Sequence, residues 1–81
     1  MNKEPRLRAT ALANVYRSQG RKLAWLSRKA GLSEPFTSRV IRGERTIALS
    51  KAQLMADALG APLFLLFEST DVDDMSTQEA A

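Results

Sequence analysis

Clustered basic side chains are the residues of this sequence whose type and spacing could do chemistry. All 12 Lys and Arg residues lie before Phe67, together with only four of the nine Asp and Glu residues. Residues 1–67 therefore carry a formal charge of +8, and residues 68–81 carry −5. Because Lys and Arg side chains bind phosphate through charge-assisted hydrogen bonds, the basic stretch predicts a polyanionic partner, among which nucleic acid is a candidate.

The sequence lacks the side chains on which most enzymes and metal sites depend. It contains no Cys and no His, so it offers no disulfide, no thiolate, no Cys or His metal ligand and no His general base. The candidate nucleophiles Ser27, Ser33, Ser38 and Ser50 have no His to activate them. The four glycines are too far apart for a phosphate-binding loop. We therefore expect a protein that is not an enzyme and that needs no cofactor or metal.

Length and hydropathy indicate one small domain followed by a short acidic extension. The chain has 81 residues, enough for a single modest core. No apolar run approaches the roughly 20 residues needed to cross a bilayer, and no apolar signal-peptide region follows the N-terminus. We expect a cytoplasmic protein with a folded domain over 1–67 and a disordered tail over 68–81, where five residues are acidic and few are apolar.

Four glycines divide the domain into segments with helical periodicity. Gly20, Gly31, Gly43 and Gly60 each follow such a segment, at the place where a helix often ends in a left-handed residue. Alternation of apolar and polar residues, which is typical of a half-buried strand, is not sustained over a useful length. The pattern predicts a compact all-α fold whose five helices cover about 6–19, 22–30, 34–42, 49–59 and 62–67.

Two of these predicted helices are joined by the three-residue turn Gly31-Leu32-Ser33. Ser33 is a strong N-cap residue for the helix that follows. Glu34 suits the first turn of that helix, and Pro35 is tolerated there because its missing N–H has no helical partner. A helix, a short turn containing glycine and a capped second helix together form the pattern of a helix-turn-helix.

The spacing of these residues resembles that of the lambda repressor/Cro-like (XRE) helix-turn-helix family. The resemblance covers 20–67 and rests on the joint positions of Leu26, Gly31, Leu32, Ser33, Val40, Gly43, Ala56, Leu59 and Gly60. Four positions depart from the family pattern: a Gln that often contacts phosphate is Leu23 here, and the family often has Ala at Ser27, Ile or Val at Thr37 and Glu at Ile41. The first departure shifts the expected phosphate contact to Arg21 and Lys22.

The resemblance implies a protein that binds double-stranded DNA with the helix over 34–42 in the major groove, which accepts one α-helix. The outward side chains of the 34–42 helix would read base edges: Glu34, Pro35, Phe36, Ser38 and Arg39. Other side chains would contact the phosphate backbone: Arg17, Arg21, Lys22, Ser33, Arg42 and Arg45. Two alternatives stay open, because Glu34 could simply cap its own helix and Phe36 could pack beneath the preceding helix.

Self-association is a further expectation, because one recognition helix reads only a few base pairs and such domains usually bind palindromic sites as dimers. The predicted last helix is apolar where the family usually carries polar residues, and Leu54 falls on the outer face of the helix before it. We expect a homodimer whose interface includes Leu54, Phe64, Leu65 and Phe67. The alternative is that these side chains pack back onto the first helix or under the tail.

The function implied is a sequence-specific transcriptional regulator, in the form of a dimeric repressor of the phage Cro-like or controller type. One alternative is the antitoxin of a toxin–antitoxin pair, in which the fold regulates its own operon while residues 68–81 wrap a basic toxin protein. Another is a protein-interaction module that has lost DNA binding, which Pro35 and the missing family Gln at Leu23 could support.

Overall fold

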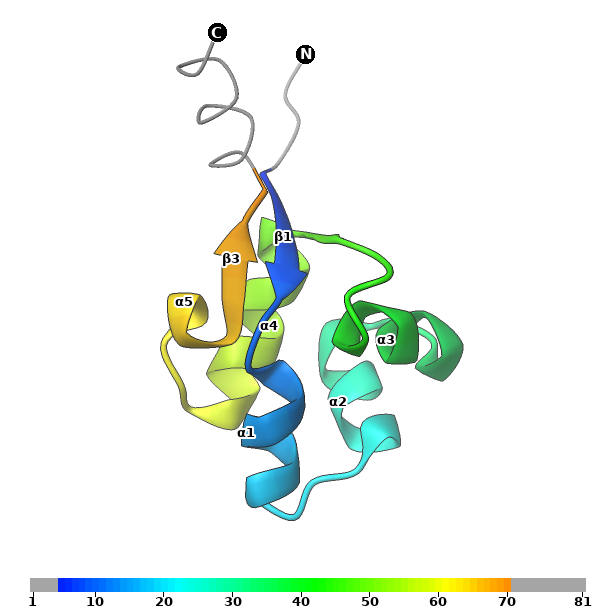
Figure 1. Cartoon of the computed structure of the whole chain (residues 1–81). Coiled ribbons are helices and arrows are strands. Elements are labelled where there is room, and N and C mark those ends of the chain that lie inside the picture. Colours follow the sequence, from blue (N-terminus) through cyan, green and yellow to red (C-terminus); the bar gives the residue numbers. More distant parts are fainter. Residues whose placement is uncertain (1–4, 71–81) are drawn as a thin grey trace, which may run out of the picture.

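The computed structural model describes residues 5–70, which form five helices and a small sheet (Figure 1). The helices are α1 Leu12–Ser18, α2 Leu23–Ala30, α3 Glu34–Ile41, α4 Leu49–Leu59 and α5 Leu63–Leu66. The strands are β1 Arg6–Ala9, β2 Ile47–Ala48 and β3 Phe67–Ser69. No helix in this part of the chain is long and apolar enough to cross a membrane.

The sheet corrects the expectation of an all-α fold. It has the order β2-β1-β3, and β1 runs antiparallel to both neighbours, with Leu7 opposite Ile47 on one side and Ser69 on the other. The helix predicted over 6–19 is therefore a strand followed by the shorter helix α1. Four residues are too few to show alternation in the sequence, and the two strands that stabilise β1 come from distant parts of the chain.

The other four helices lie where the periodicity predicts them, and only their ends differ. The predicted 49–59 helix is α4, while α2, α3 and α5 are shorter by one or two residues than expected. Gly31 and Gly60 follow α2 and α4 with φ angles of +69° and +68°. These left-handed conformations end the two helices, as the glycine positions indicate.

The N-terminus of α3 is capped as the sequence predicts. The hydroxyl of Ser33 accepts a hydrogen bond from the backbone N–H of Phe36 at 3.3 Å, and the hydroxyl of Thr37 donates to the carbonyl of Ser33 at 2.9 Å. Glu34 and Pro35 occupy the first turn. The cap begins α3 directly after the turn from α2, which produces the helix-turn-helix arrangement.

The core lies between the helices and the inner face of the sheet. Its largest fully buried side chains are Phe67, Leu7, Leu12, Leu26, Ile47, Met55, Leu66 and Val40. Phe67 is only 1% exposed, so its expected place in a dimer interface is wrong. It lies in β3, where successive side chains point to opposite faces, and this alternation directs Phe67 inward and Glu68 to solvent.

Ordered structure continues beyond the expected boundary at residue 67. Glu68 and Ser69 belong to β3, which pairs with β1. The backbone N–H and the hydroxyl of Thr70 both donate to the carbonyl of Arg6, at 3.1 and 2.9 Å. The first residues of the predicted disordered tail are thus part of the sheet, and residues 71–81 of that prediction lie outside the described residues.

Candidate nucleic-acid interface

Helix α3 has one buried face and one face turned to solvent. Thr37 and Val40 are both 0% exposed and anchor the helix to the core. Glu34, Pro35 and Arg39 are exposed, so no other described part of the chain covers the outward face. Pro35 and Arg39 are four residues apart and lie on the side of α3 away from Thr37 and Val40, and Glu34 precedes Pro35 at the border of that side. The structure therefore brings these three predicted base-reading residues together on an accessible helix.

Two other predicted base-reading residues are less accessible. Phe36 is half-buried and packs against the core, as the packing alternative expected. Ser38 is also half-buried, and its hydroxyl accepts a hydrogen bond from Nη1 of Arg42 at 2.8 Å. Both side chains border the exposed face, and a base contact from either stays a prediction.

Arg42 and Glu44 form an ion pair directly after α3. Nε of Arg42 donates to Oε2 of Glu44 at 3.0 Å, and Nη2 donates to Oε1 at 3.4 Å. The hydrogen bond from Arg42, and next its charge, lower the pKa of Glu44, and the charges of Arg39 and Arg45 act in the same direction. The same pairing raises the pKa of Arg42. The sequence prediction used Arg42 as a phosphate contact and missed Glu44, although its place between two arginines is a readable signal.

The remaining cations expected to contact phosphate lie at different places on the surface. Arg45 follows α3 and is exposed, and Ser33 is exposed at the start of α3. Arg17 is exposed at the end of α1, with its guanidinium carbon 5.7 Å from the centre of the Tyr16 ring. The structure thus brings Ser33 and Arg45 next to the two ends of α3, while Arg17 belongs to another helix.

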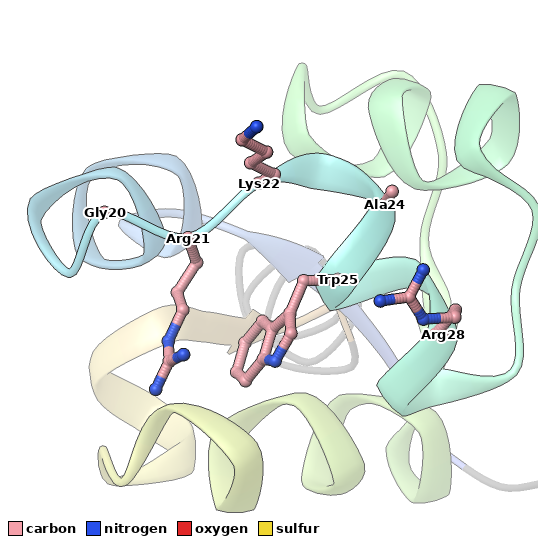
Figure 2. A pocket seen from close by; sticks show the side chains of 6 residues that line it. All are labelled: Gly20, Arg21, Lys22, Ala24, Trp25 and Arg28. Atoms are coloured by element: carbon pink, nitrogen blue, oxygen red, sulfur yellow. The ribbon is translucent and has the colours of Figure 1, made fainter.

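Arg21 and Lys22, which are adjacent in the sequence, point to opposite sides of the chain (Figure 2). Lys22 is the N-cap residue of α2, has no side-chain capping bond and extends toward α3 in this view. Arg21 instead lies over Trp25, with 4.3 Å between its guanidinium carbon and the ring centre. Only Lys22 therefore extends from the start of α2 toward the predicted recognition helix.

A hollow of about 380 Å³ adjoins the start of α2. It is lined by Gly20, Arg21, Lys22, Ala24, Trp25 and Arg28 (Figure 2). Trp25 and Arg28 are not among the functional residues predicted from the sequence. Their spacing of four and seven residues from Arg21 is the signal that could have placed them on one helix face.

The apolar residues predicted for a dimer interface are exposed, with the exception of Phe67. Phe64 is 70% exposed, Leu65 56% and Leu54 45%. The first two lie on α5 and the third on α4, and these two helices contact one another. In Figure 1, α5 lies at the side of the molecule away from α3. The structure describes one copy of the chain with these three side chains open to solvent.

A helix-turn-helix with an exposed second helix, packed on further helices, defines the class of fold, and two solved structures share it. One is the restriction-modification controller protein C.AhdI from Aeromonas hydrophila, with a TM-score of 0.60 and 25% identity over 64% of this chain and 79% of that chain. The other is a hypothetical transcription factor, NHTF, from Neisseria, with a TM-score of 0.62 and 29% identity over 76% of this chain and 71% of that chain. No protein-family model and no curated protein matches the sequence.

These two neighbours confirm the resemblance to the lambda repressor/Cro-like (XRE) helix-turn-helix family. One of them is named a controller protein and the other a hypothetical transcription factor. Within residues 5–70, no group of three or more His, Cys, Asp or Glu side chains could hold a metal ion. The surface around α3 presents cations, hydroxyl groups and apolar side chains.

Proposed function

We propose that the protein is a sequence-specific DNA-binding regulator of transcription that inserts α3 into the major groove. The observation that carries the proposal is the division of α3 into a face anchored by Thr37 and Val40, each 0% exposed, and an open face with Glu34, Pro35 and Arg39. The major groove of B-DNA is about 12 Å wide and accepts one helix of this kind. The two regulators with a similar fold support the same proposal.

Arg39 is the principal base-reading residue of the proposal. Its guanidinium is exposed and has no carboxylate partner among the described residues, so it is available for a bidentate contact with O6 and N7 of guanine. Glu34 can accept from the amino group of cytosine, and Pro35 can contact a thymine methyl group. Ser38 and the exposed part of Phe36 complete the base-reading surface, at the border with the core.

Backbone phosphates would be held by groups at both ends of α3. Ser33 directly precedes α3, Arg42 and Arg45 follow it, and Lys22 extends toward it from the start of α2. Arg42 reaches a phosphate only if its pairing with Glu44 loosens or if the phosphate shares the guanidinium with that carboxylate. Arg17 and Arg21 are the other two phosphate contacts predicted from the sequence. Arg21 should contribute least to phosphate binding, because its guanidinium lies over the Trp25 ring.

A homodimer is part of the proposal because the exposed side chains Leu54, Phe64 and Leu65 form an apolar surface on α4 and α5. A small monomer gains nothing from leaving such side chains in water. In Figure 1, α5 and α3 lie on different sides of the molecule, so pairing through α5 would leave both copies of α3 free for two half-sites of a palindrome. A dimer placed on a promoter would act as a repressor by occlusion, in the manner of Cro-like or controller proteins.

Selection of bound DNA from a random pool tests the proposal directly. The expected result is one enriched motif with two inverted half-sites, whose centres lie about one turn of DNA, roughly 34 Å, apart. A pool that shows no enrichment after repeated rounds at moderate salt would contradict sequence-specific binding. An enriched motif without inverted symmetry would leave the DNA-binding function in place and contradict the dimer.

No observation on the described residues favours the alternatives over this function. The antitoxin alternative depends on an acidic segment of which residues 71–81 lie outside the described part of the chain. The interaction-module alternative depends on Pro35 and on the missing family Gln at Leu23. The structure accommodates Pro35 in the first turn of α3 without disturbing the helix.

A further inference from the structure

One face of α2 carries Trp25, a partly buried side chain packed against the core, and two cations close to its ring. The guanidinium carbon of Arg21 lies 4.3 Å from the centre of the Trp25 ring, and Nζ of Lys29 lies 5.6 Å from it. Both distances allow cation–π attraction. Leu26 and Ala30, both 0% exposed, hold the opposite face of α2 against the core. This arrangement keeps Trp25 half-buried at the surface, where it lines the hollow described above.

The cations of this face have no carboxylate to neutralise them in the described part of the chain. Arg21, Arg28 and Lys29 lie within nine consecutive residues, together with Lys22, which extends to the other side of α2. All four are exposed, and none forms an ion pair with another described residue. The acidic residues with assigned partners lie elsewhere: Glu44 with Arg42, Glu68 with Arg8, and Asp57 with Gln53. Four neighbouring positive charges repel one another, which raises the electrostatic free energy of the folded chain. Binding of an anionic ligand would lower it.

The direction of the side chains separates this face from the proposed DNA interface. In Figure 2, Arg21 and Trp25 extend together to the side of α2 away from Lys22, and Lys22 extends toward α3. A duplex that takes α3 into its major groove and binds Lys22 would therefore leave open the part of the hollow beside Trp25. The Trp25 ring and Ala24 also line the hollow with apolar surface. A bare phosphate has no apolar group that could pack against this surface.

We propose that this face of α2 is a docking site for an acidic segment of a partner protein. One apolar side chain of the segment packs on Trp25, and neighbouring carboxylates bind Arg21, Arg28 and Lys29 through charge-assisted hydrogen bonds. The positive charge of the face requires the carboxylates of this ligand, and the apolar hollow requires its apolar side chain. The site goes beyond the proposed DNA-binding function, since it would let a second protein associate with the regulator on its operator.

Trp25 is the only tryptophan of the chain, so its fluorescence reports directly on the site. The full-length protein is titrated with a short peptide in which Asp and Glu residues flank one Leu, and with a control peptide in which Ser replaces that Leu. The Leu peptide should shift the emission in a saturable manner. The Ser peptide should bind about fivefold more weakly, because it buries less apolar surface against the ring.

Two exposed arginines provide a matched pair of variants. Arg28→Glu should abolish the response to the Leu peptide and leave the affinity for the selected operator unchanged. Arg45→Glu, which changes the same charge outside this face, should leave the peptide response intact and weaken operator binding. Thermal unfolding followed by circular dichroism checks that both variants remain folded, as their exposure predicts.

Four results would overturn the proposal. The first is an equal response to the two peptides, and the second is a full response in Arg28→Glu. The third is a loss of operator affinity in Arg28→Glu together with a Trp25 signal on adding duplex DNA, which would make the face a DNA contact. The fourth is tighter binding of a peptide copying residues 71–81 than of the Leu peptide, which would assign the site to the chain's own acidic segment and not to a partner protein. Failure of operator binding in the unmodified protein would contradict the proposed function and leave the peptide result standing.

Discussion

The side chain of Arg42 joins the carboxylate of Glu44 to the hydroxyl of Ser38, and so links the last turn of α3 to the loop that follows it. The distances are 3.0 Å from Nε to Oε2 and 2.8 Å from Nη1 to Oγ. The only carboxylate of this loop thus lies among Arg39, Arg42 and Arg45 and lowers the positive charge beside α3.

Replacing Glu44 by Gln should strengthen DNA binding. The substitution removes a negative charge beside the proposed phosphate contacts and frees Arg42. The affinity for DNA should therefore rise by about threefold at low salt, since two close surface charges interact by a free energy of this order or somewhat more. Fluorescence anisotropy with a labelled operator at several salt concentrations measures the change. Glu68→Gln is the matched control, because its carboxylate pairs with Arg8 on the sheet. Unchanged or weaker binding in Glu44→Gln would show that the pair orders the loop for DNA.

The Arg42–Glu44 pair should also make stability depend on pH in a defined direction. Because the pKa of Glu44 is lowered in the folded protein, its stabilising effect is complete above the ordinary carboxyl pKa of about 4.3 and disappears as the pH falls through the lowered value. The Tm difference between the natural chain and Glu44→Gln should thus be constant from neutral pH to about pH 5 and shrink below it. The difference will be small, since the pair is exposed. A difference that grows on acidification would contradict the assignment.

Arg39→Ala should relax base preference at one position of each half-site. Loss of a bidentate contact to guanine costs about 1–3 kcal/mol on the preferred sequence, and little on a sequence that lacks that guanine. Anisotropy titrations with the selected operator and with a single-base variant of it measure both values. Arg28→Ala is a suitable control, since this exposed arginine lies on α2 outside the base-reading face. Equal weakening on both sequences would make Arg39 a phosphate contact.

Phe64→Asp should convert the proposed homodimer into a monomer. Phe64 is 70% exposed in the single chain, so the substitution leaves the fold intact while it places a charge in the middle of an apolar contact. Analytical ultracentrifugation over a range of protein concentrations reports the association state. Asn14→Asp adds the same charge at an exposed site on α1 and serves as the control. Self-association that persists in Phe64→Asp would move the interface to another surface.

Phe67→Ala should destabilise the domain severely, in contrast to Phe64→Ala. Phe67 is 1% exposed and Phe64 is 70% exposed, so only the first substitution opens a cavity, at a cost of about 3–5 kcal/mol. Urea unfolding of both variants at one protein concentration gives the two free energies. A chain that is unfolded without urea also satisfies the expectation for Phe67→Ala. Similar stability of the two variants would show that β3 does not direct Phe67 into the core.

The helix-turn-helix could be predicted from the sequence because its signals are local. The glycine that ends α2, the Ser33 cap and the helical spacing around Val40 all act within about one turn of the chain, and the structure confirms each of them. The exposed apolar side chains of α4 and α5 were also predicted correctly, apart from Phe67. Leu54 and Phe64 depart from the face that packs inward, and that departure is visible in the spacing alone.

The sheet and the environment of the site depended on contacts between distant residues. Strand β1 exists because residues near 47 and 68 pair with it, and no pattern inside its four residues indicates those partners. The same pairing turned Phe67 inward. Likewise, the sequence predicts the same phosphate-binding role for the adjacent cations Arg21 and Lys22. In the folded chain Arg21 lies over Trp25, and Lys22 extends toward α3. Composition and periodicity thus determined the helices and the positive charge, and tertiary packing decided which cations face α3, because side-chain direction depends on neighbours that only the folded chain brings close.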